Sequence, residues 1–165
     1  MRKYIIAAAI LITTLALDII TKYLVVENIP LHERINIAGT FIQLTLTYNR
    51  GGLFGILQGY QTLFLVFSVV VLLFLIAFFI LEKNKSLLFC SSIAFIISGA
   101  IGNILDRVMG KEGVVDFVYI GSDKYFRWPA FNVADSVIVV GAFLLFVVFY
   151  QEEKKRKAAR ESAHQ

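Results

Sequence analysis

Residues 61–81 read QTLFLVFSVVVLLFLIAFFIL, a stretch without a single charged side chain. An apolar run of about 20 residues is long enough to cross the hydrocarbon core of a bilayer as a helix. The rest of the chain is similarly apolar, since 58% of its 165 residues are hydrophobic and its mean hydropathy is +0.75. Soluble domains usually contain about 45–50% apolar residues. The sequence therefore predicts a membrane protein.

Three further windows, 5–26, 87–105 and 133–150, meet the same criteria of length and low charge. The first is longer than the apolar region of a secretory signal peptide and contains Asp18, so we expect it to be retained as a span. The chain is predicted to form one mainly α-helical, polytopic membrane domain over residues 1–165, with four transmembrane helices.

Basic residues indicate how these spans are oriented. They gather in three segments, which are Arg2 and Lys3 before the first span, Lys83 and Lys85 between the second and third, and a tail at 151–165 after the fourth. Four spans put these segments on one side, which the positive-inside rule makes cytoplasmic. Both termini are then cytoplasmic. The net charge of +4 resides in terminal segments, which favours contact with anionic membrane lipids over nucleic acid.

The two longer connections, 27–60 and 106–132, are expected to face outward. Residues 41–48, FIQLTLTY, alternate apolar and polar side chains, which is typical of a strand. We therefore expect a small β-sheet, or cradle, on the outer face of the membrane. The second connection is interpreted as a loop long enough to fold over a site and act as a gate.

Charged and amide side chains interrupt the apolar spans near their outer ends, where ionisable groups are costly and usually functional. Asp18 and Lys22 share one helix face, either as a self-paired couple or as groups that position a substrate. Asn103, Asp106 and Arg107 share a face of the third span. Of these we expect Asp106 to form a network with Arg107 within the helix, and Asn103 and Arg107 to belong to a site.

Two more acids flank the fourth span. Asp116 lies in the apolar stretch VVDF of the outer loop, and Asp135 lies in FNVAD at the start of the span. Asn132 and Asp135 have the spacing of a capping box, and capping alone could explain that pair. It does not explain the apolar flanks of Asp116. Two carboxyl groups brought together at low dielectric cannot both ionise, so one can serve as acid and the other as base.

The sequence lacks the residues that a disulfide, a cysteine or histidine metal site, or a Ser–His triad would need. A single cysteine, Cys90, excludes an intrachain disulfide and argues against a cysteine metal site. His32 is the only histidine outside the extreme C-terminus, so a Ser–His triad or a histidine zinc site is poorly supported. No phosphate-binding motif accompanies the acids. We expect neither a metal nor a cofactor, and Asp123, in a polar loop, is given no role.

The order of these polar blocks resembles that of lipoprotein signal peptidase, the bacterial signal peptidase II family. The matching blocks are DIITK at 18–22, NRGGLFG at 49–55, GNILDR at 102–107, VVDF at 114–117 and FNVAD at 131–135. The resemblance implies an intramembrane aspartic endopeptidase of the bacterial cytoplasmic (inner) membrane, with its active site toward the outer leaflet. Its substrates would be diacylglyceryl-modified prolipoproteins, cleaved just before the lipidated cysteine, and globomycin would inhibit it.

By the same matching, Asp116 and Asp135 would be the catalytic acids. The residues that would line or shape the substrate site are Asp18, Lys22, Asn49, Gly102, Asn103, Arg107 and Asn132. Nothing in the pattern requires more than a monomer. Two positions depart from the usual family blocks, Leu53 and Ile19, and both concern pocket shape and inhibitor fit rather than a catalytic group.

Two other classes of protein remain as alternatives. A small proton- or ion-coupled carrier also uses acids inside the membrane, but it usually places polar groups through the midplane. Here the second span is apolar throughout, and the acids lie toward one side. A structural membrane subunit would not need an acid in the apolar stretch VVDF.

Overall fold

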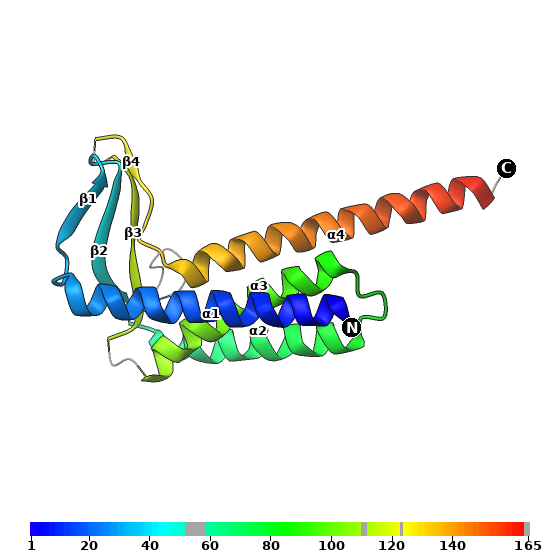
Figure 1. The fold of residues 1–165 in the computed structure, drawn as a ribbon, viewed down its shortest axis with the longest axis horizontal. Helices are drawn as coiled ribbons and strands as arrows, with labels where there is room; N and C mark the ends of the chain where they lie inside the picture. The colour runs from blue at the N-terminus through cyan, green and yellow to red at the C-terminus, as the bar shows by residue number, and fades with distance from the viewer. Residues whose placement is uncertain (52–58, 110–111, 123, 164–165) are drawn as a thin grey trace.

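The computed structural model describes residues 1–51, 59–109, 112–122 and 124–163. Four long helices form a bundle, and a small sheet covers one end of it (Figure 1). The elements in chain order are α1 (Arg2–Asn28), β1 (Arg34–Ala38), β2 (Ile42–Asn49), α2 (Gln61–Leu81), α3 (Leu87–Met109), β3 (Val114–Ser122), β4 (Phe126–Arg127) and α4 (Val133–Ala163). Leu53, which departs from the family block, and Asp123 lie outside the described residues.

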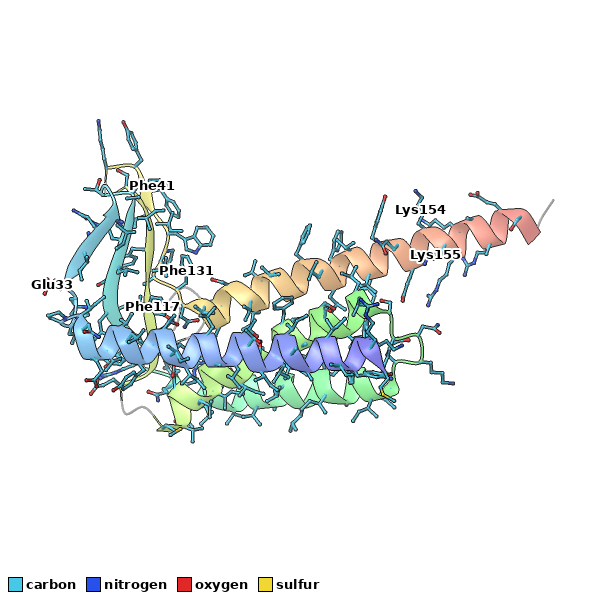
Figure 2. The ribbon with its side chains drawn as sticks, viewed as in Figure 1. Glu33, Phe41, Phe117, Phe131, Lys154 and Lys155 are labelled. Atoms are coloured by element: carbon cyan, nitrogen blue, oxygen red, sulfur yellow. The ribbon has the colours of Figure 1, made fainter. Side chains whose placement is uncertain are left out.

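All four predicted spans are confirmed as helices long and apolar enough to cross a membrane. The N-terminus and the turn between α2 and α3 lie at the end of the bundle opposite the sheet, and α4 continues beyond that end (Figure 1). The basic tail is helical as far as Ala163, with Lys154 and Lys155 on the projecting part of α4 (Figure 2).

Helix α3 lies at the centre of the bundle and packs against α1, α2 and α4. Small residues let the neighbours approach closely, because a Cβ on Gly99 would lie 2.4 Å from the carbonyl oxygen of Ala134. Some polar side chains inside the bundle also connect neighbouring helices. The Thr14 hydroxyl on α1, for example, donates to the Ser98 hydroxyl on α3 over 2.7 Å. Cys90 is buried and unpaired on α3.

The sheet is antiparallel, in the order β1-β2-β3-β4. The predicted strand at 41–48 is confirmed as β2. The interpretation of the second connection as a loop around Asp116 is wrong, because Asp116 lies on β3 and is paired with Thr47 of β2. Residues 114–117 are buried on both faces, so this strand shows no alternation of apolar and polar residues in the sequence.

Candidate active site

The two proposed catalytic acids meet where the sheet joins the helix bundle. The segment before α4 runs beside β3, since the main-chain N–H groups of Phe117 and Val118 donate to the carbonyl oxygen of Phe131 over 3.0 and 2.9 Å. Asn132 follows as the N-cap of α4, and Asp135 lies in the first turn. Strand pairing therefore brings the start of α4 next to Asp116.

Asn132 links the two acids. Its side-chain Nδ2 donates to Oδ1 of Asp116 over 2.8 Å, and its main-chain N–H donates to Oδ2 of Asp135 over 3.3 Å. Its Oδ1 in turn accepts the main-chain N–H of Asp135 over 2.8 Å, which completes the predicted capping box. Capping and site geometry are thus provided by the same fully buried side chain, rather than being alternatives.

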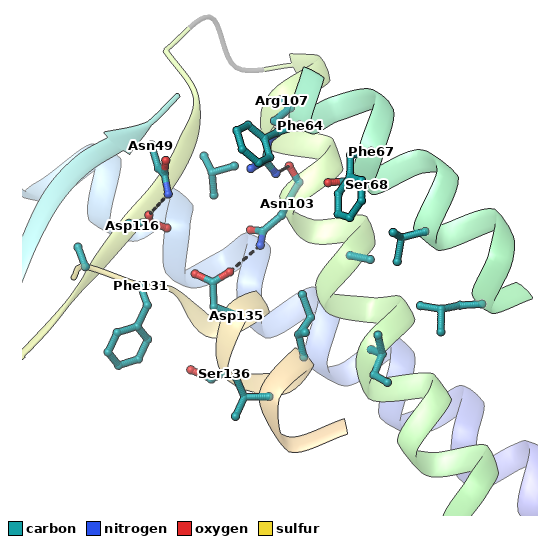
Figure 3. Close-up of a pocket in the computed structure, with 18 of the residues that line it drawn as sticks. Asn49, Phe64, Phe67, Ser68, Asn103, Arg107, Asp116, Phe131, Asp135 and Ser136 are labelled. Carbon is teal, nitrogen blue, oxygen red and sulfur yellow. Dashed lines mark hydrogen bonds between the residues drawn. The ribbon is translucent and has the colours of Figure 1, made fainter. Parts of the chain in front are cut away.

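A second amide serves each acid. Nδ2 of Asn103, on α3, donates to Oδ1 of Asp135 over 2.8 Å. Nδ2 of Asn49, at the end of β2, donates to Oδ2 of Asp116 over 3.2 Å, and Figure 3 shows both contacts. Asn49 lies two residues beyond Thr47, the pairing partner of Asp116, so it points to the same face of the sheet. Each carboxyl group is therefore fixed by two donors from different elements.

Behind this layer lies a buried ionic cluster around Lys22. Its Nζ is 2.7 Å from carboxylate oxygens of both Asp18 and Asp106, and it donates to Oδ1 of Asn103 over 3.1 Å. The last contact orients the Asn103 amide, because an oxygen facing Lys22 directs the Nδ2 group toward Asp135. Of the two alternatives for Asp18 and Lys22, the self-paired couple is confirmed by this contact, and a role in positioning substrate stays a prediction.

The predicted network between Asp106 and Arg107 within α3 is wrong. Oδ2 of Asp106 contacts Lys22 and accepts the main-chain N–H of Val115 over 3.2 Å. Arg107 instead donates to the carbonyl oxygens of Asn103 and Gly51 over 3.2 and 3.0 Å. Sequence spacing within one helix could not identify partners that α1 and the sheet supply.

Asp18 also connects α1 to the start of α4. Its Oδ1 accepts the main-chain N–H of Ala134 over 2.8 Å, so it satisfies a donor that the N-terminal turn of α4 leaves free. Gly102 makes room for this contact, because a Cβ there would lie 2.4 Å from Oδ2 of Asp18.

A cavity of about 670 Å³ opens next to the acids. Five of the predicted site residues line it: Asn49, Asn103, Arg107, Asp116 and Asp135. The other four, Asp18, Lys22, Gly102 and Asn132, are buried behind this lining and reach it through the contacts above.

Most of the cavity wall was missed by sequence reasoning. Side chains of α2 and of the segment before α4 line the cavity, among them Phe64, Phe67, Ser68, Trp128 and Phe131. The lining positions on α2 recur at helical spacing. Because the span is apolar on every face, the sequence could not indicate which face lines the cavity. Only Ser68, the sole hydroxyl in the middle of that span, offered a signal.

Burial is the main electrostatic influence on Asp116. Burial of the Asp116 carboxyl, together with the nearby negative charge of Asp135, raises the pKa of Asp116 to about 7. Donors from Asn49 and Asn132 and the charge of Lys22 act in the opposite direction but do not outweigh burial. Asp116 is 3% exposed, whereas Asp135 is only half-buried. Asp116 is therefore suited to hold a proton near neutral pH.

Comparison with known proteins identifies the family of this chain. Residues 10–151 match the family described as signal peptidase (SPase) II. A lipoprotein signal peptidase of Listeria monocytogenes is 37% identical over 153 residues, covering 92% of this chain and 97% of the relative. One from Staphylococcus aureus (strain MRSA252) is 31% identical over 158 residues, covering 94% and 96%.

Solved structures show the same fold. A bacterial membrane enzyme solved by the in meso method at 2.3 Å resolution matches with a TM-score of 0.82 and 28% identity, over 90% of each chain. A second, at 1.9 Å resolution, matches with a TM-score of 0.75 and 29% identity, over 87% of this chain and 91% of the other. The chain, a membrane peptidase, belongs to the signal peptidase II family.

Proposed function

We propose that the protein is an intramembrane aspartic endopeptidase in which Asp116 and Asp135 share one proton and activate a water molecule. The observation that carries the proposal is the Asn132 link, which holds both carboxyl groups at the polar end of a largely apolar cavity. In such a site one carboxyl group keeps its proton, so an acid and a base coexist at one pH.

The environments of the two acids support distinct roles. Asp135 takes a proton from water as the water oxygen attacks the scissile carbonyl carbon, while Asp116 donates its proton to the carbonyl oxygen. Asp135 then protonates the amide nitrogen and the C–N bond breaks. A hydroxyl proton of the intermediate returns to Asp116 as the new carboxyl group forms, so the dyad ends with the single proton it began with.

Arg107 is proposed to position the substrate main chain. It lines the cavity, and two of its nitrogens already hold main-chain carbonyl oxygens of Asn103 and Gly51. Its buried Nε has no hydrogen-bond partner within the described residues. A buried donor without a partner is costly, so a carbonyl group of a bound peptide would stabilise it.

The substrates are proposed to be prolipoproteins whose cysteine carries a diacylglyceryl group, cleaved just before that cysteine. The relatives described above are named lipoprotein signal peptidases. The apolar side chains of Phe67, Leu75 and Val139 line the cavity away from the acids, which suits acyl chains and an apolar signal sequence. We also expect globomycin to occupy this cavity, and a monomer to suffice.

The site is proposed to face the outer leaflet of the bacterial cytoplasmic membrane. Four spans and the basic residues at the end opposite the sheet support cytoplasmic termini. The carrier alternative has less support, because the polar cluster is confined to the sheet end. The core cluster of Leu75, Phe89 and Ile93, with its neighbours, is apolar.

Cleavage of a diacylglyceryl prolipoprotein by purified Asp116→Asn and Asp135→Asn variants tests the proposal. We expect both to lose at least about a thousandfold in rate, because an amide can neither hold nor accept the shared proton. Mass spectrometry of the product should place the cut before the lipidated cysteine. Glu27→Gln is the matched control, an exposed acid at the end of α1, and should cleave normally. Normal cleavage by either dyad variant would contradict the proposal.

A further inference from the structure

A second apolar groove lies at the opposite end of the bundle from the acids. It has a volume of about 250 Å³ and runs between α1, α2 and α3. Its lining residues are Tyr4, Ala7, Ala8, Leu11, Phe79, Cys90, Ile93, Ala94 and Ile97. Three alanines keep it open, and none of its lining side chains is charged. The proposed peptidase reaction makes no use of this groove.

Two lysines lie at the mouth of the groove. Nζ of Lys3 lies 5.3 Å from the ring centroid of Tyr4, and Nζ of Lys85 lies 5.4 Å from that of Phe79. Both rings line the groove and contact each other edge to face, with centroids 6.5 Å apart. Lys3 also donates to the carbonyl oxygen of Lys85, which joins the start of α1 to the α2–α3 turn.

Within the part of the chain that the structure describes, no carboxylate neutralises the charge of these two ammonium groups. Among the described residues neither forms an ion pair, and their partners are main-chain carbonyl oxygens, those of Ile80 and Glu82 in the case of Lys85. An ammonium group has three donors, so each lysine can still donate to an anion. Glu82 is the single acid of the turn, and its carboxylate accepts the main-chain N–H of Asn84.

We propose that this groove binds an anionic phospholipid, with an acyl chain between α1 and α3 and the phosphate between Lys3 and Lys85. Charge complementarity selects the headgroup, and the apolar lining accepts the chain. From Tyr4 to Leu11 the groove extends about 10 Å along α1, which suits part of an acyl chain but not a second helix crossing a core of about 30 Å. Cytoplasmic leaflets are rich in anionic lipids, and the basic segments lie at this end.

Photocrosslinking in liposomes tests the proposal on the full chain. The vesicles contain phosphatidylglycerol and phosphatidylcholine, and in parallel samples one or the other carries a diazirine on its acyl chain. Peptide mapping by mass spectrometry should find phosphatidylglycerol adducts on groove residues such as Ala94 and Ile97 in clear excess over phosphatidylcholine adducts. In Lys3→Gln/Lys85→Gln this excess should fall about thirtyfold, as expected for the loss of two lysines near an anionic surface.

Two further variants separate the groove from general effects. Lys154→Gln/Lys155→Gln removes the same charge from the projecting part of α4 and should leave the groove adducts unchanged. Ala8→Phe fills the groove from its exposed side, keeps both lysines and should abolish the adducts. Equal labelling by the two lipids, or an equal loss in the tail variant, would overturn the proposal. Persistence of the adducts in Ala8→Phe would do the same.

Discussion

At the scale of single residues, the protonation of Asp116 governs the expected pH dependence. Its pKa is raised to about 7, and in the proposed mechanism it acts in its protonated form. The value of kcat/KM should therefore fall as the pH rises above about 7, approaching a tenfold loss per pH unit. Initial rates with a lipidated peptide between pH 5 and 9 measure this. A rate that stays flat up to pH 9 would exclude Asp116 as the acid.

The same shift should affect stability, with a definite sign. Between its ordinary pKa of 3.8 and about 7, native Asp116 holds a proton that the unfolded chain has released. The free energy of unfolding should therefore decrease as the pH rises through this window. Asp116→Asn, which keeps the buried shape without a titrating group, provides the control because it removes this contribution.

Outside the dyad, substitution of Lys22 is predicted to cause the largest loss of stability. It is 4% exposed and compensates both Asp18 and Asp106. Lys22→Met leaves two carboxylates in a buried site without their cation, which should cost about 3–5 kcal/mol of stability. Thermal unfolding followed by the fluorescence of Trp128, the single tryptophan, measures the loss. The triple variant Lys22→Met/Asp18→Asn/Asp106→Asn should recover part of it, and no recovery would contradict the electrostatic explanation.

At the scale of elements, the approach of α1 to α3 depends on Gly102. A Cβ at this position would lie 2.4 Å from Oδ2 of Asp18, whose carboxylate is fixed by Lys22 and by the N–H of Ala134. Gly102→Ala should therefore destabilise the protein by about 1–3 kcal/mol, as expected for overpacking. It should also lower activity, because the displaced carboxylate holds the first turn of α4.

Gly102→Ala/Asp18→Ala serves as the matched control for that experiment. If crowding is the cause, adding Gly102→Ala to an Asp18→Ala background should cost much less than adding it to the natural sequence. If Gly102→Ala costs the same stability in both backgrounds, its effect does not come from crowding against Asp18. The comparison is a double-mutant cycle, so it isolates the contact between the two helices.

The elements also show how far the sequence could predict this fold. The transmembrane spans could be predicted from the length of their apolar runs, and β2 from its alternation of apolar and polar residues. Strand β3 does not, because its first four residues are buried on both faces. The apolar window at 133–150 also underestimates α4, since the mostly polar residues 151–163 continue the helix. Five of the proposed site residues line one cavity, but the partners of these side chains could not be predicted from the sequence. Asp106 pairs across helices, and that depends on packing.

At the scale of the whole molecule, the proposed site and the basic terminal segments lie at opposite ends of the bundle. The sheet, with Asp116 on β3, lies at one end, and the N-terminus and the projecting part of α4 with Lys154 and Lys155 lie at the other (Figures 1 and 2). On the positive-inside rule we propose that the sheet lies on the outer side of the cytoplasmic membrane and the end of α4 on the inner side. This orientation would place the dyad where a translocated lipoprotein precursor arrives.

Cysteine labelling in intact cells checks the orientation. Cys90 is the only cysteine and is buried, so a Cys90→Ser background accepts single cysteines at exposed sites. Tyr125, at the tip of the sheet, is 82% exposed, and Ser162 is exposed near the end of α4. A membrane-impermeant maleimide should label Tyr125→Cys in intact cells, and should label Ser162→Cys only after lysis. The reverse pattern would invert the topology, and would put the proposed dyad on the side that a translocated precursor does not reach.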